Sequence, residues 1–360
     1  MRILIVNPFG IGDVLFTTPL IANLKEAMPD CYIGYVCNAR AKDILLNNPK
    51  VDKIFIYEKD KFRKLWKASK ILAFRKFIKF LSSIKKKKFD IVFDLSLGQE
   101  YGFFLRFIGI KKRIGYNYKN RGVFLTDKIN ISGYDEKHIV EYYLGLLRLI
   151  GIEPRQKNLE FPLGQKEIEW AREYLYENDV NEEAILVGII PGGGASWGMD
   201  AYKKQWPQHR FAGLANQIAD RHKAKIIIFG DANEAALCNQ TASLIKDMPV
   251  MACGRTTLSK LAALVARCDL IVSNDGGPLH IAVSQGVKTI SIFGPVDPRV
   301  YGPYPQGADN LVIKKELACQ PCYEKFKLKE CVHMDCLNTV EVKEVMAAID
   351  NFLGSEIGGA

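Results

Sequence analysis

The chain has 360 residues, 48% of them hydrophobic and 25% charged, and this composition excludes a disordered or fibrous protein. Its length favours two domains of roughly 150 residues each. No uncharged apolar run reaches the ~18 residues of a membrane span, so we expect no transmembrane helix. The start, MRILIVNPFGIGDVL, has too short an apolar run for a signal peptide, which predicts a cytoplasmic location. Structural disulfides among the nine cysteines are therefore not expected.

Hydrophobic runs bounded by turn residues alternate with amphipathic segments in the first half of the chain. RILIVNP, residues 2–8, is a predicted strand, and a helical pattern follows from residue 13 to residue 28. Further strands are predicted at 31–37, 51–57 and 89–96, with a helix at 136–149. This alternation predicts a parallel sheet.

The net charge of +10 is concentrated in one segment, because Lys59 to Lys88 contains 13 Lys or Arg and a single acid, Asp60. Apolar residues recur there at helical spacing, namely Phe62, Trp66, Phe77, Phe80 and Ile84. The pattern predicts a basic amphipathic helix that binds an anionic membrane surface. The alternative is an ordinary helix that packs its aromatic side on the sheet. The rest of the chain is slightly acidic and has no nucleic-acid motif, which excludes nucleic acid as a partner.

A polar connection, residues 151–183, separates the two halves, and strand-like runs resume after it. The runs are AILVGIIPGGG (184–194), KIIIFGD (225–231), PVMACG (249–254), DLIVSNDGG (269–277) and KTISIFGP (288–295). We therefore predict an α/β protein with two parallel-sheet domains, residues 1–165 and 166–339, and a C-terminal helix and tail over 340–360.

The turn after the first strand contains Gly10, Gly12 and Asp13. A dinucleotide fingerprint needs a third glycine, where this chain has Leu15, so that interpretation is disfavoured. Two interpretations of Asp13 remain open. It either satisfies the dipole of the following helix or presents a carboxylate for chemistry.

The second half has two glycine-rich turns, at Gly192 and Gly193 and at Gly276 and Gly277, each after a predicted strand. Such turns offer backbone N–H groups to a diphosphate. Lys204 and His280 are candidate charge partners. A solvated lysine and a buried helix histidine are the structural alternatives.

Four cysteines near the end, with His333 among them, have a spacing typical of small zinc sites: Cys319, Cys322, Cys331 and Cys336. Reduced thiols are the alternative.

Four motifs occur in order between residues 1 and 350: GIGDVLFTTPLIANLKEAMPD, PGGG with KKQWP, SNDGGPLHIAVSQGVKTISIFGPVDP, and CQPC. Together they resemble the heptosyltransferase family, glycosyltransferase family 9. The resemblance implies a GT-B fold, with two Rossmann-like domains facing each other across a cleft, the first for the acceptor and the second for the nucleotide-sugar donor. It also implies inverting transfer of a sugar, typically heptose from ADP-heptose, to the lipopolysaccharide inner core.

The resemblance implies roles for particular residues. Asp13 matches the G-x-G-D carboxylate that deprotonates the acceptor, with Gly10 and Gly12 in the acceptor-side turn. Lys204 matches the lysine of K-x-W-P that contacts the donor phosphates, and Glu234 is placed like an acid that binds the donor ribose.

The D-[TSG]-G-x-x-H turn of the family matches Asp275, Gly276, Gly277 and His280, and binds the sugar and diphosphate. Gly192 and Gly193 belong to the same donor site. Many members have Thr or Ser in place of Gly276, so this chain lacks a hydroxyl there.

No Asp-x-Asp occurs at a strand end, so no metal and no cofactor besides the donor are expected. The expected partners are a nucleotide-diphosphate sugar, a lipid-linked phosphorylated saccharide and, through residues 59–88, the cytoplasmic face of the inner membrane. A nucleotide-sugar epimerase of GT-B architecture and a non-catalytic sugar- or lipid-binding module are the alternatives.

Overall fold

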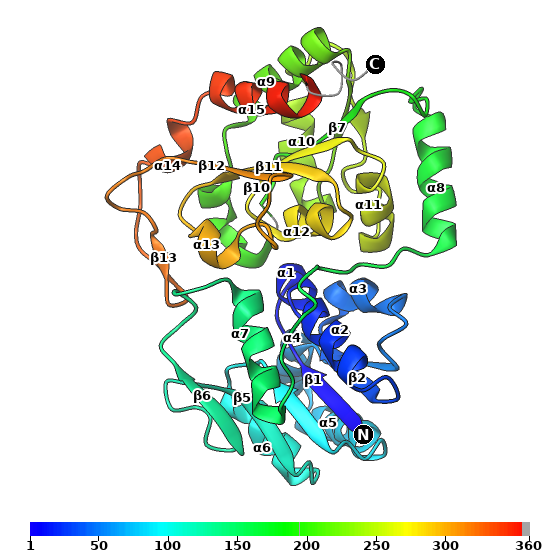
Figure 1. Cartoon of the computed structure of the whole chain (residues 1–360), viewed down its shortest axis with the longest axis vertical. Helices are drawn as coiled ribbons and strands as arrows, with labels where there is room; N and C mark the ends of the chain where they lie inside the picture. The colour runs from blue at the N-terminus through cyan, green and yellow to red at the C-terminus, as the bar shows by residue number, and fades with distance from the viewer. Residues whose placement is uncertain (194, 355–360) are drawn as a thin grey trace. The chain divides into compact units, whose positions relative to one another are not determined.

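A computed structural model describes residues 1–193 and 195–354. The chain divides into two compact units, Met1–Asn158 and Leu159–Ala360. The division falls before the boundary predicted at 165/166 and lies at the start of the extended connection to the first helix of unit 2. Figure 1 shows the two units, which are described separately below.

Unit 1 contains a six-stranded sheet in the order β3-β2-β1-β4-β5-β6, and every neighbouring pair is parallel. The strands are β1 (Arg2–Val6), β2 (Tyr32–Cys37), β3 (Lys53–Ile56), β4 (Ile91–Asp94), β5 (Lys112–Tyr118) and β6 (Asp127–Ile131). Leu4 and Val6 of β1 are buried on one face against Leu81, Ile84 and Leu105 of two covering helices. Ile3 and Ile5 alternate to the other face and are also buried.

The helices of unit 1 are α1 (Ile11–Leu15), α2 (Thr18–Ala27), α3 (Lys42–Leu46), α4 (Lys59–Ala68), α5 (Lys70–Lys85), α6 (Gln99–Phe107) and α7 (Ile139–Gly145), with 3-10 helices η1 (Ala39–Ala41) and η2 (Leu146–Ile150). The helix predicted over residues 13–28 is therefore two helices. Pro19 lies in the first turn of α2. A backbone N–H at that position makes no hydrogen bond within the helix, so proline, which lacks an N–H, is tolerated there. The helix predicted at 136–149 is α7 followed by η2.

Unit 2 contains a second six-stranded parallel sheet, in the order β12-β11-β10-β7-β8-β9. The strands are β7 (Leu186–Ile190), β8 (Lys225–Ile228), β9 (Val250–Met251), β10 (Leu270–Asn274), β11 (Lys288–Phe293) and β12 (Asn310–Lys314). A short antiparallel hairpin pairs β13 (Tyr323–Glu324) with β14 (Lys327–Leu328).

Helices cover both faces of the second sheet (Figure 1). α9 (Gln208–His222) and α15 (Val342–Leu353) pack on one face, and α8 (Gln165–Tyr176), α11 (Leu258–Val265) and α12 (Gly277–Ser284) pack on the other. The remaining helices are α10 (Ala235–Ala242), α13 (Pro298–Tyr301), α14 (Asp335–Asn338), η3 (Ala195–Lys204) and η4 (Ala232–Glu234).

Both sheets have the strand order of a doubly wound Rossmann fold, with the order reversing between β1 and β4 in unit 1 and between β7 and β10 in unit 2. Ligands of such sheets bind outside the carboxyl ends of the strands at that reversal. The predicted α/β class and two parallel sheets are confirmed. β5, β6 and β12 were not predicted, because charged and polar residues interrupt their apolar pattern.

The basic segment differs from its prediction. It forms two helices, α4 and α5, separated at Ser69, whose extended backbone and side-chain oxygen cap α5 by accepting from the Leu72 N–H. The predicted aromatic side faces mostly inward, because Phe77, Phe80 and Ile84 pack on the sheet and Phe62 stacks on Tyr57. Trp66 alone of that set is exposed, at 51%.

In the part of the chain that the structure describes, no helix is both long and apolar enough to span a bilayer.

Candidate active site

The turn after β1 holds Asp13 in a defined orientation. Gly10 caps α1, and its backbone N–H donates to Asp13 Oδ2 at 3.0 Å. The Asn7 side chain donates to the Asp13 carbonyl at 2.9 Å and accepts from the Phe9 N–H at 3.2 Å. Gly12 lies within α1. Asp13, which is partly exposed, therefore lies at the carboxyl end of β1, at the strand reversal of unit 1.

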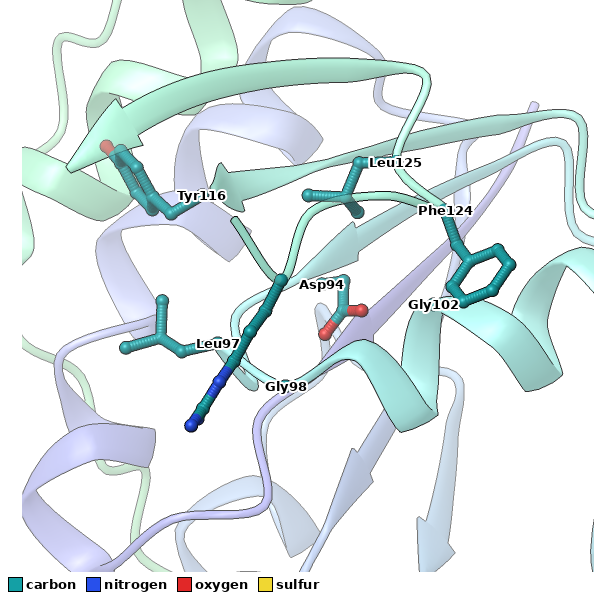
Figure 2. Close-up of a pocket in the computed structure, with 8 residues that line it drawn as sticks. Asp94, Leu97, Gly98, Gly102, Tyr116, Phe124 and Leu125 are labelled. Atoms are coloured by element: carbon teal, nitrogen blue, oxygen red, sulfur yellow. The ribbon is translucent and has the colours of Figure 1, made fainter. Parts of the chain in front are cut away.

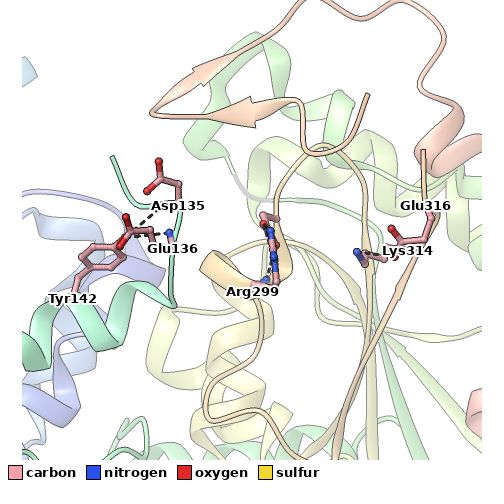
Figure 3. A network of polar contacts seen from close by, with 7 residues as sticks. Asp135, Glu136, Tyr142, Arg299, Lys314 and Glu316 are labelled. Carbon is pink, nitrogen blue, oxygen red and sulfur yellow. Dashed lines mark hydrogen bonds and ion pairs between the residues drawn. The ribbon is translucent and has the colours of Figure 1, made fainter. Parts of the chain in front are cut away.

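A second loop lies next to this turn, because the ring of His138, the N-cap of α7, contacts the ring of Phe16 edge-on at 5.1 Å. A side chain of α7 holds this loop in place. Figure 3 shows the Tyr142 hydroxyl accepting from the backbone N–H groups of Asp135 and Glu136, at 3.4 and 3.2 Å. The turn that carries Asp13 and the loop that carries Asp135 and Glu136 thus lie at the same edge of the sheet.

Asp94 ends β4, the strand on the other side of the reversal. Its Oδ1 accepts from the Ser96 N–H at 3.1 Å and from Ser96 Oγ at 2.6 Å. Burial raises the pKa of the carboxyl to about 6, against the two Ser96 hydrogen bonds that lower it. Figure 2 shows the carboxyl among the residues that line a small pocket.

That pocket, which we call the Asp94 pocket, has a volume of about 10 Å³, room for one water molecule. It is lined by Asp94, Leu97, Gly98, Gly102, Tyr116, Arg121, Phe124 and Leu125. Leu97 has a φ of 56°, a strained conformation for a branched side chain. A buried carboxyl with a raised pKa beside strained backbone makes Asp94 a candidate functional group.

In unit 2, Asn274 joins the segments that meet at the strand reversal. It is the last residue of β10, and its side-chain N–H groups donate to the carbonyls of Pro191 and Gly192, at 2.8 and 3.0 Å. Its Oδ1 accepts from the Trp206 N–H at 2.9 Å. One buried amide therefore holds the turn after β7 and the K-x-W-P segment against the end of β10.

Lys204 and Asp275 form a buried ion pair at this point. Lys204 Nζ lies 2.5 Å from Asp275 Oδ2, and the side chains are 8% and 7% exposed. The ammonium also lies 4.8 Å from the ring centre of Trp197. Trp206, fully buried, anchors the segment by donating from its indole N–H to the Val340 carbonyl at 2.9 Å. The solvated-lysine alternative is therefore wrong.

Gly192 lies against the carboxylate of Glu234, since a Cβ on Gly192 would overlap Glu234 Oε1. The backbone of its own loop holds the Glu234 side chain in place, because Glu234 Oε2 accepts from the Asp231 N–H at 3.0 Å. Gly193 lies between Lys204 and Asp275, with a Cβ there 3.5 Å from Lys204 Cβ and 3.6 Å from the Asp275 carbonyl oxygen.

Position 276 has room for glycine but not for a residue with a side chain. A Cβ on it would lie 2.6 Å from the Gly193 carbonyl oxygen and 3.0 Å from the carbonyl carbon. The missing hydroxyl at this position thus has a physical cause, because the Gly193 backbone occupies the space of a side chain. Gly277 begins α12 and His280, buried at 3% exposure, lies in its first turns. Gly194 lies outside the described residues.

The zinc hypothesis is not supported. Within residues 1–193 and 195–354, no group of three or more His, Cys, Asp or Glu side chains is arranged to hold a metal ion. Cys322 donates to the Cys319 carbonyl at 3.1 Å, and burial raises the pKa of Cys336 to about 11, which favours the thiol over the thiolate that binds metal. All nine cysteines are free thiols.

Sequence reasoning missed the positioning role of Asn274 and the burial of Asp94. Both end a buried strand with a polar side chain, next to the glycine turn of a neighbouring strand in the sheet. A rule that flags polar residues at the carboxyl ends of apolar runs would have found them.

Known structures share the fold. A glycosyl transferase family 9 protein from Veillonella parvula superposes with a TM-score of 0.81, 23% identity and 98% and 97% of the two chains covered. The ADP-heptose lipopolysaccharide heptosyltransferase II of E. coli superposes with a TM-score of 0.77, 20% identity and 99% and 100% covered. The fold is therefore the predicted GT-B fold, that of a class of glycosyltransferases.

The family-model match lies at residues 77–333, and this chain belongs to glycosyltransferase family 9 (heptosyltransferase). Lipooligosaccharide heptosyltransferase 2 of Campylobacter jejuni is 27% identical over 366 residues, with 98% of each chain covered. The chain is thus an enzyme that transfers a sugar, as predicted, and the non-catalytic alternative and the epimerase alternative are set aside.

Proposed function

We propose that this enzyme transfers heptose from ADP-heptose, with inversion and without a metal ion, to a lipid-linked inner-core saccharide of lipopolysaccharide. The observation that carries the donor half is the meeting of Lys204, Asp275, Glu234 and the glycine turns at the strand reversal of unit 2. The names of the relatives support the choice of heptose and ADP.

The donor loops suit a nucleotide diphosphate. Glu234 offers carboxylate oxygens to the ribose hydroxyls, and the backbone N–H groups at Gly193, Gly276 and Gly277 and the start of α12 suit the diphosphate oxygens. Lys204 exchanges part of its contact with Asp275 for the phosphates, and Asp275 then accepts from the sugar hydroxyls. Because these donors are fixed before the reaction, they stabilise the charge that develops on the departing ADP.

Asp13 suits the role of general base. The acceptor hydroxyl attacks the anomeric carbon, its proton passes to the Asp13 carboxylate, and the bond from the anomeric carbon to the ADP oxygen breaks. A single displacement of this kind inverts the anomeric centre. The hydrogen bond from the Gly10 N–H orients the carboxylate for this transfer.

We also propose that the enzyme works at the cytoplasmic face of the inner membrane, through α5. Ile71, Phe74 and Ile78 are exposed at 76%, 57% and 41%, and their i, i+3, i+7 spacing places them on one side of the helix. This outer stripe lies on a different side of the helix from the buried Ala73 and Ile84, and lysines and arginines of residues 59–88 flank it. An apolar stripe with flanking cations fits a surface of anionic lipids.

The test is incubation with ADP-, UDP- and GDP-activated sugars and a panel of core-lipid acceptors, with products weighed by mass spectrometry. We expect one heptose to be added from ADP-heptose only, an inverted anomeric configuration by NMR, and unchanged turnover in a metal chelator. Consumption of donor without transfer to any acceptor, or binding of donor without turnover, would contradict this proposal.

A further inference from the structure

Two thiols fifteen residues apart in the sequence lie close together beneath the loop that carries Glu234. Cys238 lies on α10, and Cys253 follows β9. The residue between them is Gly230, after β8, where a Cβ would lie 2.6 Å from Cys238 Sγ and 3.0 Å from Cys253 Sγ. The absence of a side chain at Gly230 is what allows the two sulfur atoms to lie close to each other.

The two thiols differ in the way that a reactive pair requires. Cys238 is buried, whereas Cys253 is partly exposed. The neighbouring Cys238 lowers the pKa of Cys253, against burial and the nearby Glu234 and Asp231, while the neighbouring Cys253 and burial raise the pKa of Cys238. Cys253 is thus the accessible nucleophile, and Cys238 is the neighbour that can resolve it.

Both thiols also support the backbone from which Glu234 projects. Cys253 Sγ lies 3.3 Å from the Asp231 carbonyl oxygen, and Cys238 Sγ lies 3.6 Å from the Phe229 carbonyl oxygen. Asp231 in turn accepts from the N–H groups of Asn233 and Glu234, at 2.7 and 3.2 Å. Loss of the two S–H donors would therefore remove two hydrogen bonds from the segment that leads into Glu234.

We propose that Cys238 and Cys253 are a reversible thiol-modification site, which peroxide converts to a disulfide that weakens nucleotide binding at Glu234. The weakening rests on the proposed function, whereas the disulfide does not.

The chemistry needs one peroxide. The Cys253 thiolate attacks hydrogen peroxide, the O–O bond breaks, and sulfenic acid and hydroxide form; the hydroxide takes up the proton that the thiol released on ionisation. Cys238 sulfur then attacks Cys253 sulfur, the S–O bond breaks, and the hydroxyl leaves as water with the Cys238 proton. The two sulfurs lose two electrons in total and the peroxide gains them. Bond formation brings the sulfurs to about 2.05 Å and removes both S–H donors from the loop.

The disulfide is tested by treating the whole protein with hydrogen peroxide, blocking free thiols and digesting with trypsin. Cys238 falls in the peptide 226–246 and Cys253 in 247–255, so their linkage gives a distinct mass. We expect this linked pair, its loss in Cys253→Ser and in Cys238→Ala, and its reversal by dithiothreitol. Cys268, buried, is the internal control and should stay reduced. Absence of the linked peptide, or sulfenic acid on Cys253 that never resolves, overturns the site.

The coupling is tested with ADP as the probe, by calorimetry on reduced and oxidised protein. Release of the Glu234 loop should weaken ADP binding about tenfold, the effect of losing roughly one charged hydrogen bond, and Cys253→Ser should keep its affinity under peroxide. Unchanged affinity in a fully linked protein overturns the coupling. If reduced protein does not bind ADP, the proposed function fails instead. In that case, release of the loop is tested by amide hydrogen exchange, which should be faster at residues 231–234 in the disulfide-linked protein than in the reduced protein.

Discussion

Lys204 Nζ lies 2.5 Å from Asp275 Oδ2, in a pair whose side chains are almost fully buried in unit 2. Lys204 is the last residue of η3, Asp275 directly follows β10, and both belong to the predicted donor site. A buried pair of this kind is costly to break, because removing one partner leaves the other charge buried and alone. The pair therefore links donor binding to the stability of unit 2.

Lys204→Ala should both weaken donor binding and destabilise the protein. Loss of a charged contact to phosphate should raise the Kd for ADP about 10- to 100-fold, and an unpaired Asp275 should lower the free energy of unfolding by about 3 kcal/mol. Calorimetry and urea unfolding measure the two effects. Lys203→Ala is the matched control, because Lys203 pairs with the exposed Asp200 rather than with Asp275 and should change both quantities much less. An unchanged Kd for Lys204→Ala would count against its role.

Gly276→Ala should be damaging although it adds one methyl group. The new Cβ would lie 2.6 Å from the Gly193 carbonyl oxygen, and backbone cannot move aside without displacing the donor loop. We expect a loss of about 1–3 kcal/mol in the free energy of unfolding and weaker ADP binding. Gly213→Ala, within α9, is the contrasting control, since a Cβ there would meet nothing nearer than Val342 Cγ2 of α15, at 4.0 Å. That change should stabilise the helix by up to about 1 kcal/mol. Equal melting temperatures for the two variants would refute the steric argument.

The loops that we propose to bind the donor could be selected from the sequence because they combine glycine and charged residues at the ends of apolar strands. The contact between Gly276 and Gly193 was not predictable, since it joins loops more than eighty residues apart and depends on the register of β7 against β10. In the same way, the periodicity of residues 59–88 indicated helix but not which apolar stripe faces the sheet. Helix α5 has two apolar stripes, and only its packing against β1 and β2 decides which of them is buried.

Asp13→Asn should remove turnover while leaving donor binding intact. The amide keeps an oxygen to accept from the Gly10 N–H, so the turn should hold its shape, but it cannot take a proton. Loss of a general base lowers kcat roughly 10²- to 10⁴-fold, and the Kd for ADP should stay within about twofold. Asp43→Asn, also in the first turn of a short helix, is the control and should keep full kcat. Turnover like that of the natural enzyme in Asp13→Asn would exclude the base assignment.

Phe74→Ser combined with Ile78→Ser should weaken binding to vesicles that contain phosphatidylglycerol, with little effect on the melting temperature because both side chains are exposed. Removal of two large apolar groups should reduce partitioning about tenfold or more. Tyr176→Ser, an exposed aromatic of α8, is the control and should bind as before. Salt at 1 M, which shortens the Debye length to about 3 Å, should weaken the binding that remains. Co-sedimentation with vesicles that is unchanged by both the double substitution and high salt would contradict a role for α5 in membrane binding.

Asp94→Asn should change how stability depends on pH. The folded pKa of Asp94 is raised from 3.8 to about 6, so between these values the folded state holds more protons than the unfolded state. Stability from this group is therefore complete below pH 3.8, falls as pH rises, and is lost above about pH 6. The neutral amide avoids this loss. The variant should match the natural protein near pH 4 and exceed it by up to about 3 kcal/mol at pH 8.

Urea midpoints measured from pH 4 to pH 8 check this expectation, and Ser96→Ala checks its sign. Ser96 Oγ donates to Asp94 Oδ1 at 2.6 Å and favours the charged carboxylate, so its removal should raise the pKa of Asp94 further and extend the fall in stability to higher pH. Asp90→Asn is the control at the other end of the same strand, where the carboxylate is exposed and accepts from the Arg2 N–H. Parallel pH profiles for Asp94→Asn and the natural protein would show that the buried carboxyl does not titrate in this range.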